Sequence, residues 1–255
     1  MLRKNRLIWE NIYEPSEAEV VLLGVPFDGT CTGLPGTRLA PARIREDFDL
    51  FVSGNEPGLG DLGDVKLFDA GDVDVVHGSP EDTFDSIAEA VRGIRDETKA
   101  PIITLGGDHS ITLPVVSALA EYEKFGYLCY DAHLDLLDDF NGYPNSHTCV
   151  NRRVMEVIGN VEIRGARAGS KEEWAFAKKL KPVKGKCYLS VDVDVLTGVP
   201  TGTPVPSGMK FRDLWQEISK KKVIAADIVE YNPMVGHCVV PAELLKRLIL
   251  KLSKE

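Results

Sequence analysis

The sequence predicts an α/β fold in which helices cover both faces of a parallel sheet. Three observations predict it: short apolar runs rich in β-branched residues, amphipathic stretches of helical length between them, and the nearly unbroken hydrophobicity of the runs themselves. Strands that are apolar along their whole length are typical of a sheet buried on both faces. Their regular alternation with helices is typical of repeated βα units.

The expected elements follow one another along the chain. Strands are predicted at residues 19–25, 101–107, 126–131, 186–194 and 221–230. Helices are predicted near residues 80–98, 109–122, 170–180, 211–220 and 241–253. The first helix is preceded by Ser79, a favourable N-cap residue, and begins with Pro80, which suits a first helical position. No internal repeat or linker interrupts this pattern, so we expect one domain over residues 1–255.

Composition narrows the class of protein. A chain of 255 residues with 44% hydrophobic residues can bury a full core. The net charge of −9 argues against nucleic acid or an anionic membrane surface as partner and suits a small cationic ligand. The five cysteines form no Cys-x-x-Cys pair, which favours a reducing cytoplasmic location over a disulfide framework. Residues 1–15 lack the apolar stretch of a signal peptide, and no run is long enough to span a bilayer.

Metal-type side chains gather where three of the predicted strands end. In an extended segment, alternate residues point to the same side, so a strand ending in Asp-x-His-x-Asp directs three such side chains to one place. Open α/β sheets form their sites beyond the carboxyl ends of the strands. The six candidates are His109, Asp131, His133, Asp135, Asp192 and Asp194. Because one helix and one strand separate His109 from Asp131, we expect their two strands to be neighbours in the sheet.

Two imidazoles and four carboxylates exceed what one tetrahedral zinc ion needs. This oxygen-rich set suits a pair of harder ions such as Mn²⁺, bridged by shared carboxylates and a hydroxide. Each motif alone has an ordinary explanation, because an Asp-x-Asp at a strand end is usually a solvated loop. Their joint occurrence at three strand ends favours a metal centre.

Several motifs together resemble the ureohydrolase family of arginases and agmatinases, most closely the archaeal-type agmatinases. They are Gly-Gly-Asp-His-Ser at 106–110, Asp-Ala-His-Leu-Asp at 131–135, Ser-Val-Asp-Val-Asp at 190–194, Asp-Ile-Val-Glu at 227–230 and the opening Gly-Val-Pro-Phe-Asp at 24–28. The resemblance covers nearly the whole chain. It implies a three-layer α/β/α fold with an eight-stranded, mainly parallel sheet, two Mn²⁺ per subunit, hydrolysis of guanidino compounds to urea, and assembly as a homotrimer or homohexamer.

The resemblance also implies a role for each site residue. One ion is expected on His109, Asp131, Asp135 and Asp192, and the other on Asp131, His133, Asp192 and Asp194. A hydroxide held between them is the expected nucleophile. Asp135 is predicted to be a catalytic residue as well as a ligand. Glu230 is expected to bind the guanidinium group through paired hydrogen bonds. His147 is expected to shuttle the proton that the leaving amine needs.

The substrate is predicted from a departure from the arginases. Where they place an asparagine that contacts the α-carboxylate of arginine, this chain has Leu137, followed by the acidic Asp138 and Asp139. A second departure, the shorter segment after Asp194, concerns the shape of that loop and not the metal ligands. Agmatine, hydrolysed to putrescine and urea, is therefore the expected substrate, with arginine, a guanidino acid, aminopropylagmatine or formiminoglutamate as alternatives. A binuclear phosphoesterase and a non-catalytic, metal-stabilised protein are the alternatives from other classes.

Overall fold

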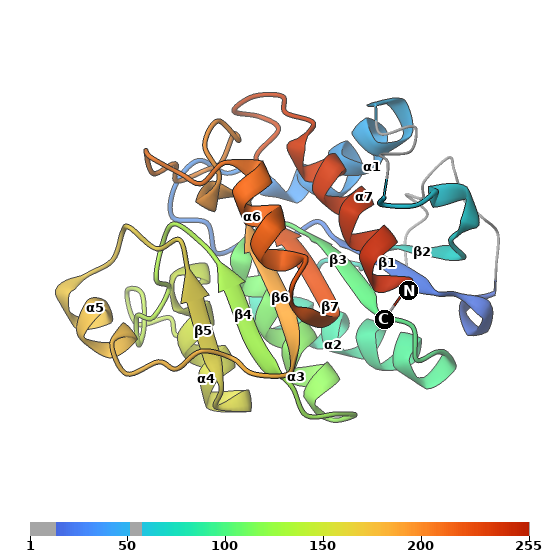
Figure 1. Cartoon of the computed structure of the whole chain (residues 1–255). Coiled ribbons are helices and arrows are strands. Elements are labelled where there is room, and N and C mark those ends of the chain that lie inside the picture. The colour runs from blue at the N-terminus through green and yellow to red at the C-terminus, as the bar shows by residue number, and fades with distance from the viewer. Residues whose placement is uncertain (1–13, 52–57, 255) are drawn as a thin grey trace.

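The protein has three layers, with a central sheet between two layers of helices (Figure 1). The computed structural model describes residues 14–51 and 58–254. These residues form a seven-stranded sheet in which every neighbouring pair of strands is parallel, in the order β2-β1-β3-β7-β6-β4-β5. The strands are β1 Val20–Val25, β2 Leu67–Asp72, β3 Ile102–Gly106, β4 Gly126–Tyr130, β5 Val161–Arg164, β6 Lys186–Asp192 and β7 Lys222–Val229.

The predicted α/β/α architecture is confirmed, whereas the expected eighth strand is not found in the described residues. The sheet ends at β2 on one side and at β5 on the other. No described segment pairs with the outer edge of either strand.

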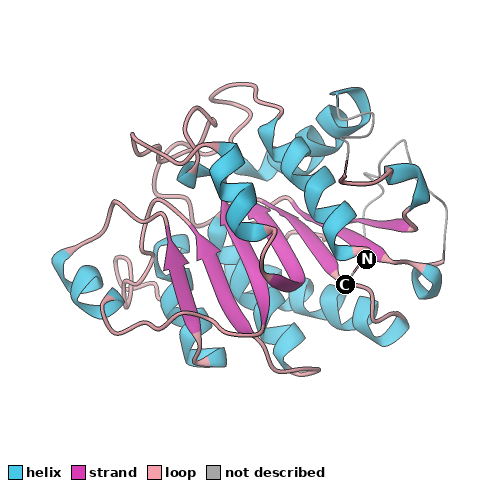
Figure 2. Cartoon of the chain, viewed as in Figure 1, coloured by secondary structure: helices cyan, strands magenta, loops and turns pink. Residues whose placement is uncertain are grey.

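The helices divide between the two faces of the sheet (Figure 2). They are α1 Ala40–Phe51, α2 Pro80–Glu97, α3 Thr112–Ala120, α4 Val150–Ile158, α5 Lys171–Ala177, α6 Phe211–Ile218 and α7 Val240–Leu252. Helices α1, α6 and α7 pack on one face, and α2, α3 and α4 pack on the other. Successive residues of β1 alternate between these two cores, with Val20 and Leu22 on one side and Val21 and Leu23 on the other. Both faces are apolar, which explains the unbroken hydrophobic runs of the sequence.

The five predicted strands are confirmed to within two residues, and two further strands were not expected. Strand β2 has the sequence Leu-Phe-Asp-Ala-Gly-Asp, whose charged residues conceal the pattern of a strand. Strand β5 has only four residues. Of the predicted helices, α3 begins three residues late because residues 109–111 form a 3-10 turn, and α1 and α4 were not predicted. The segment before residue 14, in which no signal peptide is expected, lies outside the described residues.

The strand order corrects one expectation about the site. Strands β3 and β4 are consecutive in sequence, but β7 and β6 lie between them in the sheet. The chain leaves β4 for β5 at the outer edge and returns to fill the centre with β6 and then β7. His109 and Asp131 therefore do not follow neighbouring strands, and any contact between them must cross the ends of two others.

Backbone segments approach very closely beside the site. A Cβ atom on Gly107 would lie 1.7 Å from the carbonyl oxygen of Phe27, so only glycine fits there. The backbone of Gly107 is bonded on both sides, since its N–H donates to Val25 O at 3.0 Å and its carbonyl accepts from Glu230 N at 2.9 Å. This glycine joins the ends of β1, β3 and β7.

Two further expectations bear on the whole chain. All five cysteines lie in the described part and are free thiols. Among the described helices, none combines the length and the apolar character needed to cross a membrane.

Candidate metal centre and active site

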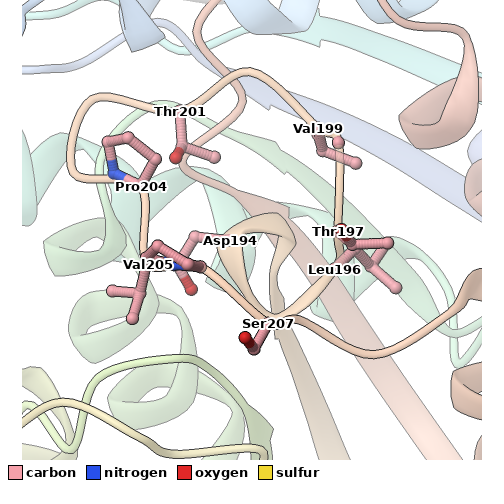
Figure 3. Close-up of a pocket in the computed structure, with 10 residues that line it drawn as sticks. Asp194, Leu196, Thr197, Val199, Thr201, Pro204, Val205 and Ser207 are labelled. Atoms are coloured by element: carbon pink, nitrogen blue, oxygen red, sulfur yellow. The ribbon is translucent and has the colours of Figure 1, made fainter.

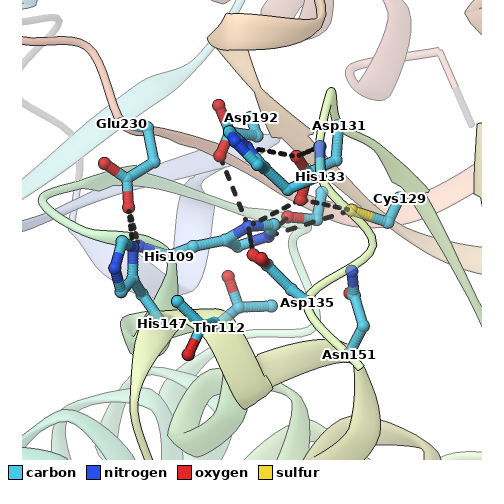
Figure 4. A network of polar contacts seen from close by, with 12 residues as sticks. His109, Thr112, Cys129, Asp131, His133, Asp135, His147, Asn151, Asp192 and Glu230 are labelled. Carbon is cyan, nitrogen blue, oxygen red and sulfur yellow. Dashed lines mark hydrogen bonds and ion pairs between the residues drawn. The ribbon is translucent and has the colours of Figure 1, made fainter. Parts of the chain in front are cut away.

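The carboxyl ends of four central strands supply the side chains of the site (Figure 4). His109 follows β3 in the 3-10 turn His109–Ile111, and Asp131 follows β4 directly. Asp192 is the last residue of β6, and Glu230 comes directly after β7. Because all strands are parallel, their carboxyl ends lie at one edge of the sheet, as expected for an open α/β fold.

His109 is the centre of the first group. Its ring is fully buried, and Nδ1 lies 3.2 Å from Asp131 Oδ2, 3.3 Å from Asp135 Oδ2 and 3.5 Å from Asp192 Oδ2. Nevertheless Nδ1 forms no hydrogen bond with any described residue. Separations close to 3 Å are those of neighbouring donor atoms around one ion with metal–ligand distances of about 2.1 Å. The geometry fits a cation between these four side chains.

His133 defines the second group. Its Nδ1 lies 2.8 Å from Asp194 Oδ2 and 3.8 Å from Asp131 Oδ1. The Asp194 oxygen is buried and lacks the geometry of a hydrogen bond to the ring, although the distance is short. Asp131 contacts both histidines and therefore lies between the two groups, where a bridging ligand belongs.

The backbone orients three of these carboxylates. One oxygen of each accepts a backbone N–H: Asp131 Oδ1 from His133 at 2.7 Å, Asp192 Oδ1 from Asp194 at 2.8 Å, and Asp194 Oδ1 from Ala132 at 2.9 Å. The second oxygen, Oδ2, faces one of the two histidines in each case. Each carboxylate is thus held by the backbone through one oxygen and directs the other toward a histidine.

A chain of hydrogen bonds sets the tautomer of His109. Ser190 Oγ donates to Asp227 Oδ1 at 2.6 Å and lies 2.9 Å from His109 Nε2. Since the serine proton is directed at Asp227, Ser190 Oγ accepts from Nε2–H. The lone pair of the neutral ring is then on Nδ1, the atom that faces the carboxylates. A carboxylate that orients a histidine in this way is typical of metal sites.

Asp227 is itself held in place on several sides. It is fully buried and also accepts hydrogen bonds from Thr112 Oγ1 and Tyr188 OH, both at 2.7 Å.

The electrostatics of the cluster favour a bound cation. Burial, followed by repulsion from Asp135 and Asp194, raises the pKa of Asp131 to about 8. Burial and the neighbouring Asp194 and Asp131 likewise raise the pKa of Asp192 well above its usual range. Ionised carboxylates crowded in this way are stable only when positive charge is placed between them. Their oxygen-rich set with two imidazoles fits manganese-type ions better than zinc or copper.

Two site residues have strained backbones. Asp135 has φ 49° and Glu230 has φ 65°, and only four described non-glycine residues have positive φ. This conformation costs an ordinary residue of the order of 1 kcal/mol or more and is common at functional sites. The strained backbone of both residues agrees with the roles that the sequence predicts for them.

His147 and Glu230 form a buried pair beside the metal-type cluster. His147 Nδ1 lies 3.0 Å from Glu230 Oε1, which also accepts the backbone N–H of His109 at 2.8 Å. Burial lowers the pKa of His147, but the hydrogen bond to Glu230 and nearby carboxylates outweigh it and raise the pKa to about 9. Oε2 of Glu230 accepts no hydrogen bond from the described residues and is available to a ligand.

The structure brings all eight predicted site residues together, including the six metal-type side chains, His147 and Glu230. The roles of Ser190 and Asp227 were not predicted, although both lie in motifs that the sequence displays. Thr30 and Thr32 were also missed, because nothing in the sequence near residue 30 indicates contact with residue 147.

The segment after Asp194 forms a loop around a pocket (Figure 3). It encloses a cavity of about 290 Å³, lined by Asp194, Leu196–Val199, Thr201 and Pro204–Ser207. Arg167 closes the loop, since its guanidinium donates to the carbonyl oxygens of Asp194 and Val205, both at 2.7 Å. The short loop is therefore tied directly to the backbone of a metal-type residue.

Comparisons with known proteins place the chain in one family. A model described as the Arginase family matches residues 18–183 and 175–253. The N(1)-aminopropylagmatine ureohydrolase of Thermococcus kodakarensis is 34% identical over 86% of this chain and 84% of its own length. The agmatinase of Bacillus subtilis is 34% identical over 94% of this chain and 92% of its own length. Among solved structures, a putative agmatinase from Clostridium difficile superimposes with a TM-score of 0.86 at 30% identity, covering 94% of this chain and 99% of the other.

Proposed function

Because this chain belongs to the arginase family and is an agmatinase-like ureohydrolase, we propose that it hydrolyses agmatine to putrescine and urea at the cluster of His109, Asp131 and their neighbours. The observation that carries the proposal is the His147–Glu230 pair, which lies beside six metal-type side chains and leaves one carboxylate oxygen available. Two Mn²⁺ ions held by the six side chains would lower the pKa of a water molecule enough to supply a nucleophile near neutral pH.

Glu230 provides the binding site for the guanidinium. One of its oxygens is held by the backbone of His109 and by His147, so the carboxylate cannot rotate away. The available Oε2 can accept an N–H of the substrate in a charge-assisted hydrogen bond. This orientation would present the central carbon of the guanidinium to the attacking water.

His147 supplies the proton for the leaving group. Hydrolysis breaks the bond between the guanidinium carbon and the alkylamine nitrogen, and that nitrogen must gain a proton as it departs. The Nδ1 atom of His147 is held by the same carboxylate that binds the guanidinium, so its proton lies next to the substrate.

The choice of agmatine rests on the surroundings of Leu137. This half-buried side chain offers no hydrogen bond where arginine would carry its α-carboxylate. The acidic neighbours contribute less than the sequence suggests, because Asp138 is paired with Arg153 at 2.8 Å and is largely exposed. An unpaired buried polar group costs about 1–3 kcal/mol, and a charged group such as the α-carboxylate costs more, which predicts at least a roughly tenfold preference for agmatine over arginine in kcat/KM.

N(1)-aminopropylagmatine is the second candidate substrate, because one of the most similar relatives is named for it. Formiminoglutamate and the guanidino acids would each bring a carboxylate and meet the same difficulty as arginine.

Urea release from this panel after activation with Mn²⁺ tests the proposal, with formamide measured in parallel. We expect the highest kcat/KM for agmatine or its aminopropyl derivative. The Leu137→Asn variant should reduce the difference in kcat/KM between agmatine and arginine. If the unaltered protein released urea from arginine as efficiently as from agmatine, the preference for agmatine would be refuted. Urea from none of the guanidino compounds would refute the proposed reaction. The two-Mn²⁺ content, trimeric or hexameric assembly and cytoplasmic location remain predictions.

A further inference from the structure

The loop after β1 forms hydrogen bonds with His147, and its contact with the ring is at the nitrogen that does not face Glu230. Thr30 and Thr32 both lie on this loop. The backbone N–H of His147 donates to Thr30 Oγ1 at 3.0 Å. The Nε2 atom of His147 accepts the backbone N–H of Thr32 at 3.2 Å and lies 2.9 Å from Thr32 Oγ1. Each ring nitrogen therefore has its own partner, with Glu230 at Nδ1 and Thr32 at Nε2.

The loop is itself anchored beneath the site. Asp108 is fully buried, and its Oδ2 accepts the backbone N–H of Thr30 at 2.9 Å and the Thr30 hydroxyl at 3.0 Å. Its Oδ1 is held by the backbone N–H and the hydroxyl of Ser110. The position of Thr32 relative to His147 is thus set by buried contacts.

His147 is shielded from solvent, whereas Thr32 is not. Only 6% of His147 is exposed. Thr32 is an exposed residue and lines a surface cavity of about 330 Å³, together with Gly29–Cys31, Phe140, Tyr143 and nearby residues. The Thr32 hydroxyl therefore joins the buried ring nitrogen to solvent, and unlike a backbone N–H it can both accept and donate a proton.

We propose that the Thr32 hydroxyl is the solvent end of a proton relay that runs through His147. This inference rests on the proposed hydrolysis. At the start Nδ1 carries the ring proton, directed at Glu230, and Nε2 carries none. When the amine leaves with the Nδ1 proton, Nε2 receives one from Thr32 Oγ1, which solvent replaces. When the next attacking water loses a proton to Nδ1, Nε2 returns its proton to Thr32 Oγ1 and from there to solvent. The protons that the ring gains and loses in the two half-steps balance, so the imidazole returns to its starting tautomer without rotating.

Replacing the hydroxyl while preserving the backbone N–H tests the relay. Thr32→Val removes Oγ1 with little change of shape, and Thr32→Ser retains it. On the Mn²⁺-loaded enzyme with agmatine, we expect Thr32→Val to lower kcat roughly 10- to 100-fold with KM nearly unchanged, a smaller loss than that of a whole general acid. Imidazole in the buffer should restore part of the rate, and Thr32→Ser should stay within about threefold of the original. Thr148→Val is the matched control, because within the described part of the chain that hydroxyl bonds only to Ser146 and Cys149.

A second measurement does not depend on turnover. The exchange of the His147 ring N–H with solvent is followed by NMR on protein loaded with diamagnetic Mg²⁺, and Thr32→Val should slow it more than tenfold. Unchanged kcat or unchanged exchange in Thr32→Val would overturn the relay. Equal losses in Thr32→Val and Thr32→Ser, without rescue by imidazole, would overturn it as well and indicate a packing role. If the unaltered enzyme releases no urea from any guanidino compound, the proposed function fails, and the exchange measurement still decides whether Thr32 connects His147 to solvent.

Discussion

His147 and Glu230 are 83 positions apart in the sequence, yet Nδ1 of one lies 3.0 Å from Oε1 of the other. The Glu230 carboxylate, which would bind the guanidinium, therefore also positions His147, the proposed proton donor. The two functions are therefore coupled through one side chain.

Replacing His147 should remove the proton donor and leave the metal-type cluster intact. We expect His147→Ala to lower kcat for urea release roughly 10²- to 10⁴-fold, the usual effect of losing a general acid or base. Metal content, measured by elemental analysis, should stay near that of the unaltered protein because none of the six cluster side chains is changed. Loss of metal from the variant would instead make His147 a ligand and contradict its assignment.

Asp131 and Asp192 should each affect both metal ions, because they are the two carboxylates assigned as bridges. The saturated protein should hold about two Mn²⁺ per chain, and Asp131→Ala or Asp192→Ala should reduce the occupancy of both positions. Asp138→Ala is the control, since that carboxylate is exposed and paired with Arg153. A single tightly bound zinc ion, or full occupancy in both bridge variants, would rule out the binuclear assignment.

Ser190 should control metal affinity without touching a metal. Its hydroxyl lies between His109 Nε2 and Asp227, so Ser190→Ala removes the partner that directs the lone pair of Nδ1 toward the carboxylates. Loss of such a partner typically weakens metal binding about 10- to 100-fold, which competition with a chelator would measure. The matched variant is Ser86→Ala, because the Ser86 hydroxyl donates only to Asp82 O on an exposed part of α2. Equal affinities in the two variants would show that the tautomer is set by other means.

The thermal stability of the metal-free protein should fall as the pH rises from about 5 to 8. Burial, with repulsion from Asp135 and Asp194, raises the pKa of Asp131 to about 8 in the fold, against about 3.9 for an unfolded chain. The folded state then binds the proton more tightly, so this stabilisation is complete below about pH 4 and is lost as the pH approaches 8. His133, whose pKa is raised to about 9 by Asp194 despite its burial, acts in the same direction.

Melting temperatures measured with EDTA and with Mn²⁺ between pH 5 and 8 would check this. The gap between the two curves should widen with pH, because bound cations favour the ionised carboxylates. Asp131→Asn should flatten the EDTA curve. A gap that stays constant or narrows would contradict the prediction.

The sequence by itself determined the fold class and the chemical nature of the site. Val20–Val25 is a strand whose two faces are both covered by helices. Burial on both faces requires consecutive apolar residues, so it can be recognised in the sequence. Alternation likewise places Asp131, His133 and Asp135 together, since side-chain direction along an extended segment is a local property. Strand β2 was missed because its charged residues conceal this local pattern. Both charged residues, Asp69 and Asp72, are buried and form ion pairs with Arg45, at 2.8 and 2.6 Å.

Only the tertiary structure decided which strand ends meet. His109 and Asp131 were expected at neighbouring strands, yet β7 and β6 separate β3 from β4, and the side chains still approach to 3.2 Å across those strand ends. The hydrogen bond between Ser190 and Asp227 and the contact of Thr32 with His147 also depend on how the strands and loops are arranged in the fold. Strand order depends on how helices and sheet pack over the whole chain, and a contact between residues 32 and 147 has no signature within either segment. The residue types of the candidate metal ligands could therefore be predicted from the sequence. Their hydrogen-bond partners and the tautomers of the histidines depend on tertiary packing.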